Sequence, residues 1–186
     1  MIYGQKIRLR SAEKEDLKTF VRWFNDPHVR QHLTMFRPLS MAQEERWFEN
    51  LLQQENEVFF VIDIDTENHW TPLGTVGLHP IDWKNRSAVF GICLGTPDDW
   101  GKGYGTDAVR TMLRYCFEEL NLNRVELNVF EDNERAIRCY EKSGFRQEGL
   151  KRQAMYRHGK YVDVIIMSVL KGEFILKRFD PPIQQV

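Results

Sequence analysis

The sequence of 186 residues is short of three things: paired cysteines, long apolar runs and an excess of charge of either sign. Its cysteines, Cys93, Cys116 and Cys139, are odd in number and lie at no motif spacing. This pattern argues against a disulfide framework and against a zinc site. We therefore expect reduced thiols, a cytoplasmic location and no bound metal.

Neither hydropathy nor charge points to a membrane or to nucleic acid. No apolar stretch approaches the ~20 residues of a spanning helix, and the N-terminal MIYGQKIRLR lacks the apolar core of a signal peptide. The net charge of −1 lacks the basic footprint of nucleic-acid and anionic-membrane binders. We expect one soluble domain over residues 1–178 and a loose tail over 179–186, where Pro181 and Pro182 oppose regular structure.

Apolar periodicity alternates along the chain between the spacing of strands and that of helices. Strands are expected over residues 5–10, 58–65, 73–81, 87–95, 124–130, 151–157 and 161–170, with a turn at 67–72. Helices are expected after Ser11, from Ser40 with Gln43 as its capping partner, over 104–120, and from the cap Asn133 to the stop Gly144. This order indicates an α+β (α/β) domain with helices packed against a mixed sheet.

Three glycines stand at alternate positions in the stretch DDWGKGYGTDAV, residues 98–109. Gly101, Gly103 and Gly105 follow a predicted strand and precede a predicted helix, where backbone N–H groups and the helix dipole form an anion site. Lys102 adds a cation, so the loop fits a diphosphate group. The spacing is neither the dinucleotide fingerprint G-x-G-x-x-G nor the triphosphate loop G-x-x-x-x-G-K-[ST], and a flexible turn explains the glycines about as well.

A second motif, NERAIRCYEKSGF at residues 133–145, follows the glycine loop. Together the two stretches resemble the GNAT acetyltransferase superfamily, whose loop reads Q/R-x-x-G-x-G/A and whose next motif reads N-x-x-A-x-x-x-Y-x-x-x-G-F. The second pattern is matched at every position, by Asn133, Ala136, Tyr140, Gly144 and Phe145, whereas the loop departs from the first pattern at Trp100. The initial IRLR and the R-x-G-x-Y-x-D of 157–163 are similar to the branch that acetylates ribosomal-protein N-termini, the RimJ/RimL type.

The resemblance implies an acetyl-CoA-dependent N-acetyltransferase with a central, mostly antiparallel sheet that splays between strands 87–95 and 124–130. It implies that the pantetheine arm pairs with the backbone of the first of these strands and also contacts Asn133. It further implies that the loop amides hold the pyrophosphate. The residues so expected at the cofactor are Ile92, Cys93, Leu94, Trp100, Gly101, Lys102, Gly103, Tyr104, Gly105, Thr106, Asn133 and Tyr140.

Acetyl transfer to an amine needs an acid for the leaving thiolate and a route for the proton of the amine. The resemblance assigns the acid to Tyr140, which could equally be a packed tyrosine of an amphipathic helix. Many relatives carry a glutamate where this chain has Val89. His79 is our candidate base because it ends a strand and titrates near neutral pH. The alternatives are His32, Glu126, Asp163 and a chain of water molecules.

A covalent acetyl-cysteine intermediate at Cys93 is disfavoured, because a cysteine inside an apolar strand usually behaves as a small hydrophobe. The resemblance likewise implies direct transfer within a ternary complex.

The acceptor is left open between a peptide N-terminus, including that of a ribosomal protein, and a small amine. The segment 25–40 is expected to contribute to specificity, together with the hairpin 151–170. A polyamine or aminoglycoside would call for clustered carboxylates, but Glu44, Glu45 and Glu49 are interpreted as a solvated helix face. A non-catalytic CoA-binding module, an enzyme for longer acyl chains and a homodimer are also left open.

Overall fold

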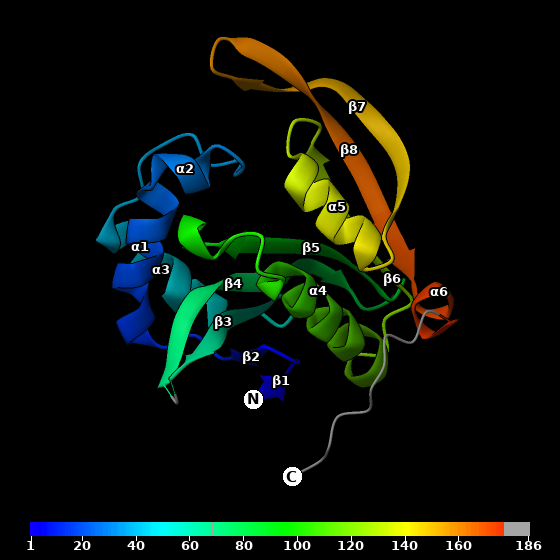
Figure 1. Ribbon diagram of the computed structural model, residues 1–186, viewed down its shortest axis with the longest axis horizontal. Helices are drawn as coiled ribbons and strands as arrows, with labels where there is room; N and C mark the ends of the chain where they lie inside the picture. Colours follow the sequence, from blue (N-terminus) through cyan, green and yellow to red (C-terminus); the bar gives the residue numbers. More distant parts are fainter. Residues whose placement is uncertain (68, 177–186) are drawn as a thin grey trace.

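The structure, a computed structural model, describes residues 1–67 and 69–176, so the expected tail at 179–186 lies outside the described residues. Figure 1 shows the arrangement of the elements. The strands are β1 (Ile2–Tyr3), β2 (Ile7–Arg10), β3 (Val58–Thr66), β4 (His69–Asp82), β5 (Ser87–Leu94), β6 (Arg124–Phe130), β7 (Arg146–Arg157) and β8 (Lys160–Leu170). The α-helices are α1 (Leu17–Asn25), α2 (Pro27–Arg30), α3 (Met41–Leu51), α4 (Tyr104–Arg114), α5 (Glu134–Lys142) and α6 (Lys171–Leu176).

The strands of the described residues form one sheet of eight, in the order β1-β2-β3-β4-β5-β6-β8-β7. Neighbouring strands in it are antiparallel, except that β5 and β6 run parallel. The expected mixed, mostly antiparallel α+β fold is confirmed. Among the described helices, none combines the length and the apolar character that crossing a membrane requires.

The parallel pair at the centre of the sheet separates after three residues. Partners are aligned from Ser87 opposite Arg124 to Val89 opposite Glu126, and the register ends there. Beyond that point β5 stays paired with β4 as far as Leu94, while β6 stays paired with β8. The predicted splay is therefore present, and it leaves one edge of the second half of β5 without a strand beside it.

Both faces of the sheet are covered, and the alternation of β3 shows how. Phe60 and Ile62 belong to the main core, which includes α4 and residues of α5. Phe59 and Val61, one position out of step, belong to the smaller core with α1 and α3. Because successive strand residues point to opposite faces, a continuously apolar strand such as β3 needs helices on both sides.

The predicted helix caps hold in most places. The Ser40 hydroxyl accepts a hydrogen bond from the Gln43 amide at 3.3 Å, and the Gln43 side chain accepts one from the Ser40 amide at 3.0 Å. The Asn133 carbonyl oxygen caps α5 by accepting from the Ala136 amide at 3.3 Å. Gly144 directly follows the end of α5 with φ +103°, a conformation that favours glycine.

Three expectations about local structure are wrong. The first helical turn follows Glu13 rather than Ser11, because the Asp16 carboxylate accepts a hydrogen bond from the Glu13 amide at 2.9 Å. Most of the expected turn at 67–72 belongs to β4, whose pairing with β3 extends to His69 opposite Thr66. The strand expected from 151 begins at Arg146, since β7 pairs with β8 from there.

The expectation of a solvated acidic face on the helix after Ser40 is also wrong at one position. Glu45 and Glu49 are exposed, but Glu44 is 4% exposed, and its Oε1 is buried without a hydrogen-bond partner among the described residues. Burial raises the pKa of Glu44 to about 7. Glu44 is therefore a buried carboxyl group, and the folded chain favours its protonated form.

We predict that Glu44→Gln flattens the pH dependence of stability between pH 4.5 and 7. In the unfolded chain the carboxyl ionises near its ordinary pKa of 4.5, whereas in the folded chain it holds its proton up to about pH 7. Wild-type stability relative to the variant therefore falls by up to about 3 kcal/mol as pH rises through this window and is constant below it. Thermal melts across the window measure this, with the exposed Glu45→Gln as the matched control. Parallel curves for wild type and Glu44→Gln would contradict the account.

Candidate active site

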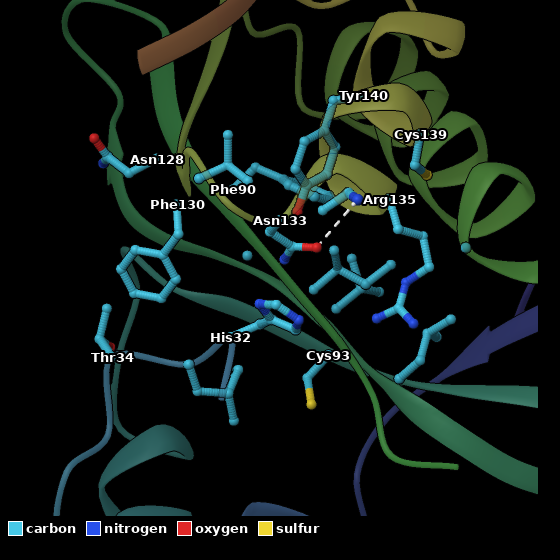
Figure 2. Close-up of a pocket in the computed structure, with 18 of the residues that line it drawn as sticks. His32, Thr34, Phe90, Cys93, Asn128, Phe130, Asn133, Arg135, Cys139 and Tyr140 are labelled. Atoms are coloured by element: carbon cyan, nitrogen blue, oxygen red, sulfur yellow. Dashed lines mark hydrogen bonds between the residues drawn. The ribbon is translucent and has the colours of Figure 1, made fainter. Parts of the chain in front are cut away.

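A cavity of about 860 Å³ opens where β5 and β6 part. Strands β4, β5 and β6 form its floor, the glycine loop and α5 form one end, and the segment after α2 and strand β7 form the other. Figure 2 shows the side chains that point into it. The predicted site residues that line it are His79, Ile92, Cys93, Leu94, Trp100, Gly101, Gly103, Gly105, Thr106, Asn133 and Tyr140.

The free edge of β5 supplies backbone groups to this cavity. A Cβ atom on Gly74 would collide with the Cys93 carbonyl oxygen, so that carbonyl faces β4. Because backbone polar groups alternate in direction along a strand, those of Ile92 and Leu94 face the gap left by β6. The backbone contact predicted for residues 92–94 is thus open to Ile92 and Leu94, while Cys93 lines the cavity with its side chain.

The glycine loop has the backbone form of an anion site. Gly101 and Gly103 have φ angles of +82° and +92°, which non-glycine residues rarely adopt. Gly103 is the N-terminal cap residue of α4, and no side chain caps this helix end. The first N–H groups of α4 therefore point outward without a side-chain acceptor, and the helix dipole favours negative charge at that place.

Trp100 forms a wall beside the loop. Its Nε1–H donates to the Leu94 carbonyl at 3.1 Å, and the Arg135 guanidinium lies 3.6 Å from the centre of its ring. The residue that departs from the family pattern thus holds the end of β5 and positions a cation at the cavity. The cation–π contact contributes about 0.5–1 kcal/mol where it is exposed.

Two predicted loop residues do not line the cavity. The Lys102 ammonium pairs with the Asp99 carboxylate at 2.8 Å, which raises the pKa of Lys102, and Tyr104 packs against the main core. Three cations of α5 line this end of the cavity instead, namely Arg135, Arg138 and Lys142. Sequence reasoning missed them, although their spacing of three and four residues marks one face of a helix.

Asn133 and Tyr140 come to the cavity from the start and the last turn of α5. The Asn133 carbonyl oxygen is used as the helix cap, which leaves its NH₂ group to donate into the cavity. Figure 2 shows the Tyr140 ring beside Phe90, with its hydroxyl directed toward the cavity. The ring packs edge-on against Phe90 and Phe145, at 6.3 and 5.7 Å between ring centres. The Tyr140 ring therefore packs against the core, while its hydroxyl group reaches the cavity.

Burial sets the protonation of the two groups nearest the centre of the cavity. It raises the pKa of Tyr140 above the ordinary value of a phenol, and the neighbouring Cys139 and Cys93 raise it further. It also raises the pKa of Cys93 to about 12. Tyr140 is therefore protonated at neutral pH, and Cys93 is a thiol rather than a nucleophilic thiolate.

Two of the residues considered as bases line the cavity, and two do not. His79 lies over Gly91 of β5, and His32 projects from the segment after α2 (Figure 2). Burial lowers the pKa of His32, Asp132 raises it, and Arg135 and Arg157 lower it; its Nδ1 is buried without a partner among the described residues.

Glu126 and Asp163 are instead engaged outside the cavity. Glu126 pairs with Arg124 at 3.1 Å, and Asp163 accepts from the Gln153 amide at 2.7 Å. The side chain of Val89, where relatives have a glutamate, lines the cavity but carries no titratable group.

The sequence and the fold are similar to those of known proteins. Residues 6–146 match the family model of the acetyltransferase (GNAT) domain. The chain is 33% identical to an uncharacterized N-acetyltransferase, p20, of Bacillus licheniformis, over 93% of this chain and 97% of that protein. It is 38% identical to the putative ribosomal N-acetyltransferase YdaF of Bacillus subtilis, but only over 54% of this chain and 55% of that protein. The ribosomal branch therefore stays a prediction.

A solved structure has the same fold and similar dimensions. The crystal structure of spermidine N-acetyltransferase from Vibrio cholerae, in complex with CoA and spermine, superposes with a TM-score of 0.86. Its sequence is 27% identical to this chain, and the match covers 92% of this chain and 99% of that one.

Proposed function

Because the chain belongs to the GNAT acetyltransferase family and is an acetyl-CoA-dependent N-acetyltransferase, we propose that it acetylates a small primary amine by direct attack within the cavity between β5 and β6. The observation that carries this proposal is the cavity itself. It joins a free strand edge, an uncapped helix end and a buried phenol in one space. These are the three features that a thioester with a diphosphate tail requires at once.

The proposed path of acetyl-CoA follows these features. The pantetheine arm lies along β5 and bonds to the backbone of Ile92 and Leu94, and the Asn133 amide donates to it. The N–H groups of residues 101–106 hold the pyrophosphate, with Arg135 close by. This path ends with the thioester between β5 and Tyr140.

The proposed chemistry is one displacement. The amine nitrogen forms a bond to the thioester carbonyl carbon, the carbon–sulfur bond breaks, and Tyr140 donates its proton to the departing CoA thiolate. The phenol is then reprotonated from solvent. The amine loses its proton to a base or to water, and no covalent acetyl-enzyme is formed.

We propose His32 as the base ahead of His79, which stays the second candidate. His32 has an unpartnered Nδ1 in the cavity, and a lowered pKa keeps it neutral at pH 7. We predict that His32→Gln lowers kcat by about 10²–10⁴-fold and removes the fall of kcat/KM on the acidic side of neutral pH.

His79→Ala is the comparison variant for that prediction. Loss of the acidic limb in His79→Ala, with its retention in His32→Gln, would reverse the assignment. Retention in both variants would point to water as the proton acceptor.

The comparisons point to two kinds of acceptor amine. The name of the Vibrio cholerae relative favours a polyamine such as spermidine, and the partial match to the ribosomal relative favours a protein N-terminus. We retain spermidine as the second candidate on that ground. A homodimer and the extent of the domain over residues 1–178 stay predictions.

The test is release of CoA thiol from acetyl-CoA in the presence of single amines: spermidine, free amino acids, an aminoglycoside and a ribosomal-protein N-terminal peptide. We expect amine-dependent release with at least one small amine, and mass spectrometry identifies the acetylated product. Release with the peptide alone would contradict the small-amine proposal. Binding of acetyl-CoA with no release for any amine would favour the non-catalytic module.

A further inference from the structure

The end of the cavity away from the glycine loop is lined by a different set of residues from the loop end. We call it the acceptor end and define it by His32, Thr34, Asn128, Phe130 and Lys151. Figure 2 shows Thr34, Asn128 and Phe130 on the opposite side of the cavity from the Arg135 and Cys139 labels. Under the proposed function acetyl-CoA occupies the loop end, so the amine approaches from the acceptor end.

The ionised side chains at the acceptor end are cations. The Lys151 ammonium reaches from β7 to the Asn128 carbonyl oxygen at 3.0 Å. The Arg157 guanidinium lies 4.3 Å from the centre of the ring of Phe130, which lines the cavity, whereas Arg157 itself does not. One of its nitrogens, Nη1, is buried without a hydrogen-bond partner among the described residues. This guanidinium also acts on His32, whose pKa it lowers.

Carboxylates are missing where a polycation would need them. Within the described part of the chain, no aspartate or glutamate lines the cavity. Glu131 accepts from the Asp163 amide at 3.1 Å, and Asp163 accepts from the Gln153 amide, so both serve the backbone of the hairpin. Asp132 is exposed and outside the cavity lining, although it raises the pKa of His32.

We propose that the acceptor is a primary amine that also carries a carboxylate, and that the Lys151 ammonium binds the anion. This inference rests on the proposed function, since it names the substrate class of the same site. The Arg157 guanidinium, stacked on the cavity-lining Phe130, adds positive charge nearby without lining the cavity itself. A second ammonium group at this place would face the Lys151 ammonium with no carboxylate of the cavity lining to offset it, and such like-charge contacts discriminate strongly between ligands.

The test compares amines of one chain length that differ only in the far end group. δ-Aminovalerate carries a carboxylate, pentylamine a methyl group and cadaverine a second ammonium. We expect kcat/KM for δ-aminovalerate to exceed that for pentylamine by about tenfold or more, with cadaverine lowest. A preference of the wild-type protein for cadaverine or spermidine would overturn the inference and leave the proposed acetyltransfer intact. Acetylation of none of these amines, nor of the amines in the first panel, would count against both.

Charge reversal identifies the groups responsible. Lys151 is exposed, and we expect Lys151→Glu to keep the fold, as a thermal melt verifies, and to lower the δ-aminovalerate to cadaverine ratio by about tenfold or more. Lys171→Glu is the matched control, because the Lys171 ammonium also bonds to an asparagine oxygen at 3.0 Å, that of Asn121, away from the cavity. An equal change of the ratio in both variants, or none in Lys151→Glu, would overturn the role of Lys151.

Discussion

Gly103→Val is expected to weaken acetyl-CoA binding by about 100-fold or more while the protein remains folded. Gly103 has φ +92°, and its amide stands at the uncapped start of α4. A valine disfavours this backbone form, and its Cβ would lie 3.5 Å from the Lys6 ammonium, so the loop amides can no longer keep this arrangement. Loss of one or two hydrogen bonds to a charged group costs about 1.5–3 kcal/mol each, which gives the expected factor. Calorimetric titration with acetyl-CoA measures it.

A control separates this effect from backbone strain. Gly159 has φ +80° in the turn between β7 and β8, and a side chain there would meet no atom within 4 Å. Gly159→Val therefore brings a similar strain, about 1–3 kcal/mol, without approaching the cavity. We expect both variants to lose similar thermal stability and only Gly103→Val to lose acetyl-CoA binding. Unchanged affinity in Gly103→Val would mean that the loop does not hold the pyrophosphate.

Tyr140→Phe is expected to lower kcat by about 10²–10⁴-fold with little change in the Kd of acetyl-CoA. Phenylalanine retains the packing against Phe90 and Phe145 and removes only the hydroxyl. Burial raises the pKa of Tyr140, so the wild-type phenol holds its proton through neutral pH, and the proposed transfer requires direct contact between its hydroxyl and the thiolate. Because this contact is made only as the thiolate departs, kcat and kcat/KM should fall together.

The matched control for this variant is Tyr115→Phe. Tyr115 is partly buried beside Phe60, with ring centres 5.5 Å apart, and burial raises its pKa as well, but it does not line the cavity. We expect its kinetics to match those of wild type. A kcat of Tyr140→Phe within about threefold of wild type would remove the tyrosine from the chemistry and leave it as part of the core.

Those parts of the cavity were predicted from the sequence whose structure depends on a single local signal. The alternating glycines, the cap at Asn133 and the stop at Gly144 are each fixed by residues within one turn, and the structure has them in these places. The order of the longer strands and helices followed from apolar periodicity in the same way, whereas the short elements β1, α2 and α6 were not expected. The helix start expected after Ser11 was wrong because the first turn follows Glu13, whose amide donates to the Asp16 carboxylate. The same carboxylate also accepts a hydrogen bond from Arg10 at 2.7 Å.

Contacts between distant segments could not be predicted. One local contact was also overlooked, because Lys102 seemed free to bind a phosphate but pairs with Asp99, three residues earlier. The cationic character of the acceptor end depends on Lys151 of β7 reaching Asn128 of β6, although β8 lies between these strands in the sheet and the two residues are 23 positions apart in the chain. That feature follows from tertiary packing rather than from local propensity. The burial of Glu44 had a local signal that was missed, because Glu44 precedes Trp47 by three residues and Leu51 by seven and so lies on the apolar face of the helix.

Direct transfer in one ternary complex is the central claim, and the pattern of initial rates tests it. Rates are measured over a grid of acetyl-CoA and acceptor concentrations, and the mass of the enzyme is recorded after exposure to acetyl-CoA alone. Intersecting double-reciprocal lines and an unmodified protein mass are expected, because Cys93 is a half-buried thiol whose pKa is raised to about 12 by burial. Parallel lines together with an acetylated enzyme would contradict direct transfer.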